Sequence, residues 1–575
     1  MKNRLMIGIV TGMTALSVWA CGNGATQGTQ ASSETEAEAE TPAETEAEAP
    51  AEAEAEAPAE TEAEAPAETG TEAETPAQAE AVSDVIPTFT LDSYYQMDNA
   101  EDGTVLSSGS YEIVKLTEEA AMNFTTLNKT IEGENDELTE RFKSSYGEIR
   151  AAAGSAYQDY DSGDGQFPKG ELESRIEAVR CDGEILSLLE TFYTYYPGAA
   201  HGITGYSGYN YNTSGAPVEL TDVFKDPKAL APVAAENLIS VSDGSKITDV
   251  DDLLKEAFTE NYDNLTWVID RDGVTFIFAP SDIAAYAAGT LEAKISFDKY
   301  PDLFTGNYGP AEGSFVKKLS DYAQTSVDLD GDGTEETILV TGISEEGENH
   351  YQQTALRIEI NGQTFDTQEY FFGQTSYLVH TKDGRNYIYA VISTDNDYPI
   401  LIVFEIKDKT PAEVGRMEGT SFAYEYYPSL NEDGLLDDEN TFSKMYPMLD
   451  PENFMLGTRM NLMSTYSAQK PYKVGSDGMP EALTDYYSIN VSFNLTTLQA
   501  LTAEKVDAET GELTGEQGEI PAGTECTLWR TNGVDTVDIK LEDGSAYRFH
   551  IDMEGPITVN GVKLEEAFEG YQFAG

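Results

Sequence analysis

Hydrophobic positions recur at helical spacing in two stretches of the chain. The first runs from Asp136 to Tyr146, and its apolar residues lie four, four and three positions apart, which predicts a helix with one buried face. That face consists of Leu138, Phe142, Tyr146 and Ile149. The second stretch, Asp249–Phe258, has the same period. We expect it to pack into a core through Leu253, Leu254, Ala257 and Phe258.

Apolar runs on either side of Asp-Gly pairs predict three β-hairpins. They are Ile176–Tyr196 with its turn at Asp182-Gly183, Trp267–Phe278 with its turn at Asp272-Gly273, and Asp535–Met553 with its turn at Asp543-Gly544. Strands dominate beyond a break near Gly306, where the runs ETILVTG, ALRIEI, NYIYAVIS and PILIVFEI occur. The C-terminal hairpin resembles part of a small barrel of the bacterial SH3 type.

The fold class that these patterns predict is α+β with several domains. We expect a companion α+β domain over 87–175 and a second α+β domain over 176–305. A β-rich, propeller-like region is expected over 312–469, and a small β-barrel-like domain over 470–575.

The N-terminal segment is typical of an exported lipoprotein. Lys2 and Arg4 precede an apolar stretch from Leu5 to Ala20, and Val18-Trp19-Ala20-Cys21 resembles a lipobox. Residues 1–21 are therefore expected to be a lipoprotein signal peptide, with Cys21 as the lipidated residue; an ordinary secretory signal is the alternative. Residues 22–86 form a Glu-, Ala- and Pro-rich, low-complexity segment, in which AETEAEAP stands at 43–50 and again at 59–66. We expect it to be a disordered spacer that holds the folded part away from the membrane.

Composition narrows the class of partner. The 34 Lys and Arg residues face 104 Asp and Glu residues, so the formal net charge is −70, which excludes nucleic acid and favours cations and basic proteins. Beyond Cys21 the cysteines are Cys181 and Cys526, which leaves open either one bridge or two separate thiols.

One segment carries a family resemblance. The residues YPGAAHGITGYSGYNYNTSGAPVELTDVF (Tyr196–Phe224) and DGVTFIFAPSDIAAYAAGTLEAKISF (Asp272–Phe297) resemble an extracytoplasmic domain of RsiV-type anti-sigma factors, which act as lysozyme receptors. The same domain accompanies the catalytic module of PdaC-type peptidoglycan deacetylases. The resemblance implies a sensing or binding role. The deacetylase motifs are not found here.

His201 lies among glycines and tyrosines in that motif. Gly198, Gly202 and Gly205 mark backbone that needs a positive φ or a close approach. His201 has neither a nucleophile motif nor metal-ligand spacing near it, so we interpret it as a turn residue that hydrogen-bonds its loop. A ligand contact is the second interpretation and catalysis the third. The ligand-binding candidates are Tyr196, His201, Tyr206, Tyr209 and Tyr211.

A second motif, VDLDGDGTEETILV (Val327–Val340), resembles the calcium loops of integrin-type propeller repeats. Alternating acidic residues, a glycine for the turn and a later Glu supply the hard oxygen ligands that Ca²⁺ prefers. Position twelve is Leu339, so the loop is not an EF-hand. The expected ligands are Asp328, Asp330, Asp332, Thr334 and Glu336.

These observations predict a non-enzymatic protein, lipid-anchored on the extracytoplasmic face of the cell membrane. Its RsiV-like domain is expected to bind a basic extracellular protein of the lysozyme type or a cell-wall glycan, with a calcium-stiffened β module behind it. Two alternatives stay open: an enzyme that modifies cell-wall polysaccharide through paired carboxylates, and a structural spacer or adhesin.

Overall fold

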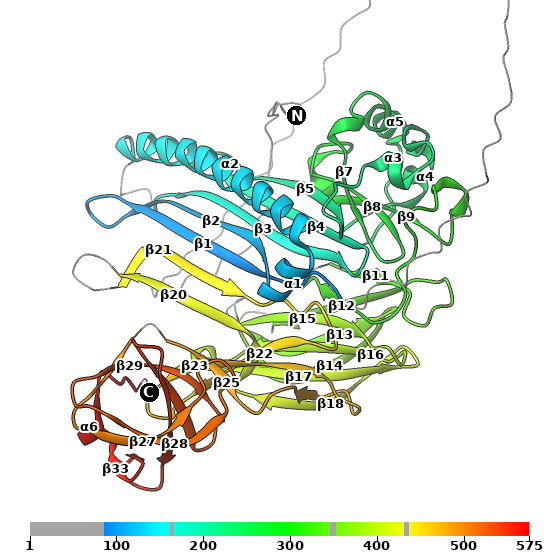
Figure 1. The fold of residues 1–575 in the computed structure, drawn as a ribbon. Helices are drawn as coiled ribbons and strands as arrows, with labels where there is room; N and C mark the ends of the chain where they lie inside the picture. Colours follow the sequence, from blue (N-terminus) through cyan, green and yellow to red (C-terminus); the bar gives the residue numbers. More distant parts are fainter. Residues whose placement is uncertain are drawn as a thin grey trace, which may run out of the picture. The chain divides into compact units, whose positions relative to one another are not determined.

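A computed structural model describes residues 85–573, apart from 161–165, 243, 322, 345–351, 431–435 and 492. The predicted signal peptide, Cys21 and almost all of the predicted spacer lie outside the described residues. The described part is a strand-rich α+β structure with five sheets (Figure 1). This bears out the α+β class. The domain boundaries stay a prediction.

A seven-stranded sheet contains the N-terminal strands and one distant hairpin. All neighbours are antiparallel except β2 and β3, which are parallel. In sheet order its strands are β20 (Tyr424–Leu430), β21 (Leu436–Met445), β1 (Phe89–Asn99), β2 (Val105–Leu116), β3 (Gly170–Cys181), β4 (Ile185–Tyr195) and β5 (Ile203–Asn212). The hairpin β3–β4 is the one predicted at Asp182-Gly183, so this prediction is confirmed.

Helix α2 (Thr125–Gln158) lies in the crossover connection between the parallel strands β2 and β3. It lies across one face of the sheet (Figure 1). The short α1 (Glu118–Asn123) precedes it, capped by the Thr117 hydroxyl. The predicted apolar face is confirmed, since Leu138, Phe142, Tyr146 and Ile149 are all buried. The helix starts earlier than expected because Leu127 and Ile131 continue the same face.

A four-stranded antiparallel sheet shares a second hydrophobic core with several helices. The strands, in order, are β6 (Leu238–Ser240), β9 (Leu291–Ser296), β8 (Gly273–Phe278) and β7 (Thr266–Ile269). Helices α3 (Leu220–Val223), α4 (Ala231–Asn237) and α5 (Asp251–Thr259) share its core. The hairpin at Asp272-Gly273 and the helix near Asp249–Phe258 are confirmed. Leu254 and Phe258 are fully buried, but the expected burial of Leu253 is wrong: its side chain is 46% exposed.

Two sheets pack face to face in the region predicted to be propeller-like. One contains β11 (Thr325–Val327), β12 (Glu336–Ile343), β13 (Gln353–Ile360) and β14 (Gln363–Phe371). The other contains β10 (Phe315–Leu319), β15 (Gly373–His380), β16 (Asn386–Ser393), β17 (Pro399–Lys407) and β18 (Thr410–Glu418). They share one core. The five-stranded sheet buries its other face too, through Tyr377, Tyr389 and Val403.

The C-terminal strands form a branched, open sheet. Its main path is β19 (Thr420–Phe422), β22 (Phe454–Met460), β23 (Tyr466–Val474), β25 (Tyr487–Asn490), β29 (Glu525–Thr531), β30 (Thr536–Leu541), β31 (Ala546–Asp552), β27 (Leu501–Val506) and β28 (Leu513–Ile520). Branching from it are β24 (Pro480–Ala482), β26 (Leu495–Thr497), β32 (Thr558–Val559), β33 (Val562–Lys563) and β34 (Phe568–Glu569), with α6 at Leu564–Ala567. The hairpin at Asp543-Gly544 is confirmed.

The predicted propeller and SH3-like barrel are corrected by this topology. Within residues 85–573 and outside the gaps, the strands make open sheets, with no closed barrel and no ring of blades. The reason is pairing between distant segments. Strands β22 and β23 extend the C-terminal sheet instead of closing it, and the β20–β21 hairpin joins β1 far upstream.

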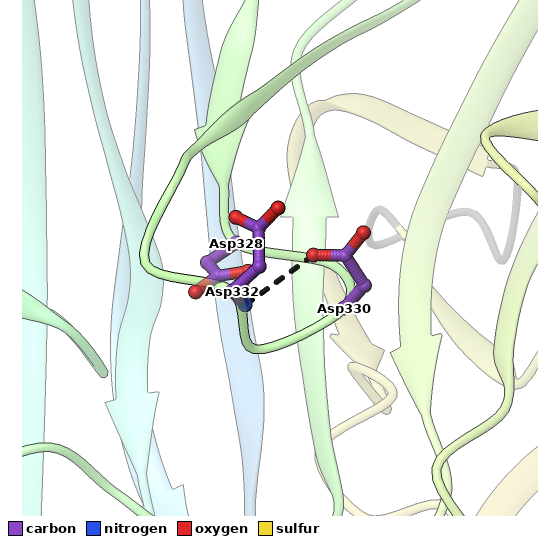
Figure 2. Close-up of side chains that lie close together, drawn as sticks. All are labelled: Asp328, Asp330 and Asp332. Atoms are coloured by element: carbon purple, nitrogen blue, oxygen red, sulfur yellow. Dashed lines mark hydrogen bonds between the residues drawn. The ribbon is translucent and has the colours of Figure 1, made fainter.

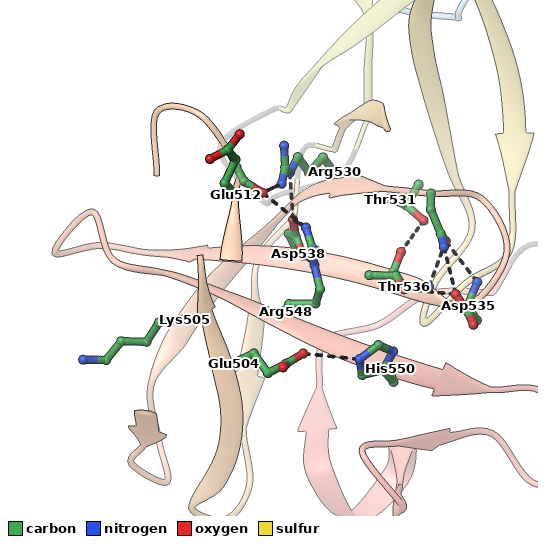
Figure 3. Close-up of polar contacts among 12 residues, drawn as sticks. Glu504, Lys505, Glu512, Arg530, Thr531, Asp535, Thr536, Asp538, Arg548 and His550 are labelled. Carbon is green, nitrogen blue, oxygen red and sulfur yellow. Dashed lines mark hydrogen bonds and ion pairs between the residues drawn. The ribbon is translucent and has the colours of Figure 1, made fainter. Parts of the chain in front are cut away.

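A buried ion triplet holds the centre of the C-terminal sheet (Figure 3). Asp538 on β30 is inaccessible to solvent, and it pairs with Arg530 on β29 at 2.7 Å and with Arg548 on β31 at 2.8 Å. The two guanidinium groups also contact the Tyr486 ring. Every charge of the triplet has partners within the sheet, so we interpret it as structural.

Candidate functional site

The loop between β11 and β12 brings three carboxylates together (Figure 2). One oxygen atom from each of Asp328, Asp330 and Asp332 lies within 4.8 Å of the others. Gly331 and Gly333, at φ 74° and 82°, let the loop curl so that alternate side chains converge. Asp330 and Asp332 are exposed, and Asp328 is partly buried.

Backbone N–H groups fix the orientation of these carboxylates. Asp328 accepts hydrogen bonds from the N–H groups of Gly331 at 2.7 Å and Gly333 at 2.8 Å. Asp332 accepts one from Thr334 at 2.7 Å, which lowers its pKa. The backbone of the loop thus holds the carboxylates of Asp328 and Asp332 in place, and the acidic cluster could hold a metal ion.

Glu336, the fifth predicted ligand, is engaged by other groups. Its side chain is buried, accepts the Leu329 N–H at 3.0 Å and pairs with Lys409 Nζ at 2.6 Å. Lys409 also lies 3.2 Å from Asp330. The carboxylates of Asp328, Asp330 and Asp332 therefore converge, and the tethered ammonium group of Lys409 partly neutralises that of Asp330. These three oxygen donors fit a hard cation such as Ca²⁺, which would complete its shell with backbone oxygens and water.

Two of the tyrosine candidates point toward α2. Tyr209 donates to buried Glu190 at 2.8 Å, and Arg141 of α2 pairs with the same carboxylate at 2.6 Å. Tyr211 lies in the core beside α2, and burial raises its pKa. Residues two apart on a strand share a face, so both rings serve packing between the sheet and the helix.

Tyr206 lies on the opposite face of β5, where its hydroxyl contacts Thr290 at 2.7 Å. Asn210, which the motif analysis passed over, shares this face. Its amide donates to the Trp267 carbonyl at 3.0 Å and accepts the Ile269 N–H at 3.1 Å. It thereby satisfies the open edge of β7 and joins the two sheets.

His201 and Tyr196 lie apart from these residues. The His201 ring stacks on Tyr286, with centroids 5.3 Å apart, and its buried Nδ1 has no hydrogen-bond partner. The hydrogen bond predicted between His201 and its loop is therefore not made by this nitrogen. Tyr196 packs against a small cluster formed by residues of α2 and by Leu172 of β3. The five ligand candidates are thus spread over two faces of the sheet and a loop.

The glycines of the motif permit close ring packing, as expected. A Cβ atom at Gly202 would lie 2.3 Å from the Tyr193 ring, and one at Gly205 would lie 2.2 Å from the Phe192 ring. Cys181 and Cys526 are both free thiols, which settles the alternative left open by the sequence. Burial raises the pKa of the Cys526 thiol to about 12, so it is unreactive at neutral pH.

Helix α5 and the residues that flank it present an acidic exposed surface. The segment Asp249–Asp263 contains six acidic residues and one basic residue, Lys255, and all seven side chains are exposed. We call this the acidic α5 surface: Asp249, Asp251, Asp252, Glu256, Glu260 and Asp263, with the exposed side chain of Leu253 among them. The helical period predicted the buried face, but which of two adjacent leucines is buried depends on neighbours far along the chain.

The geometry defines a strand-rich α+β protein with a small α+β domain beside an acidic loop. Residues 221–298 of that domain match the family model described as "Protein of unknown function (DUF3298)". The chain therefore contains a DUF3298 domain, the RsiV-like domain expected from the sequence, over these residues. No curated protein matches the chain.

Two solved structures of DUF3298 family proteins are similar to the chain. One, from Bacteroides fragilis, is 17% identical with a TM-score of 0.29, and the match covers 39% of this chain and 96% of that one. The other, from Pseudomonas aeruginosa, is 16% identical with a TM-score of 0.26, and the match covers 40% and 100%. Among the described residues, no helix is long and apolar enough to span a bilayer.

Proposed function

We propose that this chain is a non-enzymatic cell-surface protein whose DUF3298 domain binds an extracellular basic protein of the lysozyme class. A cell-wall glycan is the alternative ligand of the same domain. The observation that carries the proposal is the acidic α5 surface, which lies inside residues 221–298.

Charge and one exposed apolar side chain both favour a protein ligand here. The exposed carboxylates attract a cationic partner and speed its encounter. Leu253, 46% exposed, offers an apolar contact at the centre of the charged group. Such an anchor surrounded by charge is the arrangement expected of a protein interface with a buried centre and a polar rim.

The test measures binding of hen-type basic lysozyme to the purified chain by calorimetry and by association kinetics. Reversing two charges, with Asp252→Lys plus Glu256→Lys, should slow association and weaken binding about tenfold or more, because both carboxylates are exposed on α5. Leu253→Asp should mainly speed dissociation. Glu565→Lys plus Glu566→Lys on α6 makes the same charge change at other exposed positions and should leave binding nearly unchanged.

Two results would contradict the proposal. Binding that vanishes completely by about 0.3 M salt would reflect general charge attraction, since screening removes exposed long-range interactions at that strength. Release of soluble product from purified cell wall would instead support the polysaccharide-modifying enzyme.

We further propose that the Asp328–Asp332 loop binds Ca²⁺. Carboxylate oxygens with no nitrogen or sulfur ligand among the described neighbours suit calcium better than zinc. Lys409 already contributes positive charge at Asp330, so calcium must displace one tethered ammonium contact. This favours a moderate affinity, of the kind common in extracellular modules.

The same proposal includes attachment to the membrane by lipid at Cys21. Its support is the pattern of Lys2, Arg4 and the apolar run that ends at Cys21. A lipid anchor and the acidic segment over 22–86 would hold the DUF3298 domain at the extracytoplasmic face, where a secreted basic protein is met first.

A further inference from the structure

A groove of about 680 Å³ opens outside the DUF3298 domain, where the start of β17 meets β18–β20 and β22–β23. Its volume falls within the range of small-molecule sites. The lining combines two aromatic rings, amides, the carboxylates of Glu418 and Glu425 and one guanidinium group, that of Arg459. The rings are those of Tyr398 and Tyr424, and the amides include those of Gln469 and Asn490.

Two tyrosine rings line the groove with much of their surface exposed. Tyr398 and Tyr424 are each 46% exposed, whereas Tyr387 and Tyr389 of β16 are completely buried. Gly419, at φ 65°, lies under Tyr398, and a Cβ atom there would be 3.4 Å from the Tyr398 hydroxyl oxygen. The backbone therefore leaves the first ring close to the groove wall.

A buried carboxylate lies in the wall beside the rings. Glu425 is 9% exposed and accepts hydrogen bonds from Tyr446 at 2.7 Å, from Tyr427 and from Gln469. Among the described residues, no Lys or Arg forms an ion pair with it. Hydrogen bonds from neutral side chains thus hold the Glu425 carboxyl group in one orientation.

The two tyrosine donors to Glu425 are held as neutral phenols. Burial and the adjacent carboxylate raise the pKa of Tyr427 to about 12 and raise that of Tyr446 further. Asn490 in turn hydrogen-bonds Tyr427. A carboxylate has about four acceptor positions, and Tyr427, Tyr446 and Gln469 occupy three of them on Glu425, which leaves one for a ligand hydroxyl.

We propose that this groove binds an uncharged saccharide segment. A sugar ring has an apolar C–H face that fits an exposed tyrosine ring and a hydroxyl edge that fits a fixed carboxylate and amides. The rings of Tyr398 and Tyr424 contact the faces, and Glu425 accepts a sugar hydroxyl. This site is separate from the DUF3298 domain and does not depend on what that domain binds.

The experiment titrates the purified chain with three neutral tetrasaccharides: chitotetraose in its N-acetylated form, cellotetraose and maltotetraose. At least one should bind with a dissociation constant below about 10 mM. Tyr398→Ala and Tyr424→Ala should each weaken that binding about tenfold. Tyr370→Ala removes a tyrosine that is 60% exposed on β14, away from the groove, and should leave binding unchanged.

Glu425→Gln keeps the side-chain shape and should also weaken binding, with thermal melting as the check on folding. If this variant does not fold, the two exposed tyrosines still decide the matter. The α5 charge reversal should leave saccharide binding intact, and the groove variants should leave lysozyme binding intact, so the two proposals fail separately.

Three outcomes overturn the inference. No tetrasaccharide binds at about 10 mM, or binding survives both tyrosine changes. In the third, spermine binds through Glu425 while the sugars do not, which would assign the groove to a cationic ligand attracted by Glu418 and Glu425.

Discussion

Gly208 and Asn210 occupy the face of β5 that meets the open edge of β7. Asn210 pairs with the β7 backbone in both directions, and Ser187 of β4 adds a bond to the Ile269 N–H at 3.0 Å. A Cβ atom at Gly208 would lie 2.0 Å from the Trp267 carbonyl oxygen. Only glycine, which has no Cβ atom, permits this approach, so the packing of β5 against β7 of the DUF3298 sheet requires glycine at position 208.

We expect Gly208→Ala to lower the free energy of unfolding by about 3 kcal/mol or more, because the added methyl must push two backbones apart. Chemical denaturation measures this change. Gly147→Ala is the matched control: this exposed residue of α2 has open space around it, so alanine should stabilise the helix by about 0.5–1 kcal/mol.

An equal, small effect of both glycine changes would show that β5 and β7 do not approach as described. The Tyr-Asn-Tyr pattern alone could not reveal this contact. Alternation predicts that Tyr209 and Tyr211 share a face and that Asn210 takes the other. It does not say which distant backbone Asn210 meets, since that depends on Trp267, 57 residues later.

At the scale of elements, local signals were reliable where the structure is local. The three Asp-Gly hairpins form as predicted, because their turn residues and strand patterns are adjacent in sequence. The start of α2 was placed too late, although Leu127 and Ile131 extend its apolar face. Leu253 was misplaced because the period does not distinguish the edge of a buried stripe from its centre.

The acidic loop is the element whose stability we expect calcium to change. Ca²⁺ binds the folded loop, where three carboxylates converge, better than the unfolded chain, so millimolar calcium should raise the melting temperature. Asp330→Ala should abolish this rise and the calorimetric isotherm, because it removes one of the three exposed or half-exposed ligands. Asp543→Ala, in a different exposed turn, should keep both.

Identical melting of the native chain and Asp330→Ala, with and without calcium, would rule out the site.

Glu335, next to this loop, pairs with Lys294 of β9 at 2.7 Å, and Lys294 also pairs with Asp272 at 2.6 Å. The loop is therefore joined by ion pairs to the DUF3298 domain. The order that calcium gives to the loop would be transmitted to that contact.

At the scale of the whole described chain, distant pairing decides the architecture. Residues of β1 pair with β21 about 350 positions later, and such pairing leaves no trace in local periodicity. The propeller and barrel predictions assumed that strands close with their sequence neighbours. A clue was present in NYIYAVIS and PILIVFEI, whose unbroken apolar runs fit a sheet buried on both faces, as β16 and β17 are.

Buried charges also connect the parts of the described chain. Asp270, after β7, is 5% exposed and pairs with Lys317 of β10. Burial alone would raise the pKa of Asp270, but Lys317 and Lys294 outweigh it and hold the pKa below its usual range. The carboxylate stays ionised at neutral pH, so an ion pair joins the DUF3298 domain to the β-rich region. Removing either partner would leave a buried charge unpaired and lower the stability.

Attachment to the membrane is the prediction that belongs to the molecule as a whole. If Cys21 carries lipid, Cys21→Ser should move the protein from the membrane fraction to the medium, because the acidic chain has no attraction to an anionic bilayer. Detergent partitioning and immunoblotting of cell fractions measure the shift. Cys181→Ser changes a thiol inside the folded part and should leave the protein membrane-bound. Retention of Cys21→Ser in the detergent phase would mean that another feature of the chain holds it at the membrane, and the lipid anchor would have to be abandoned.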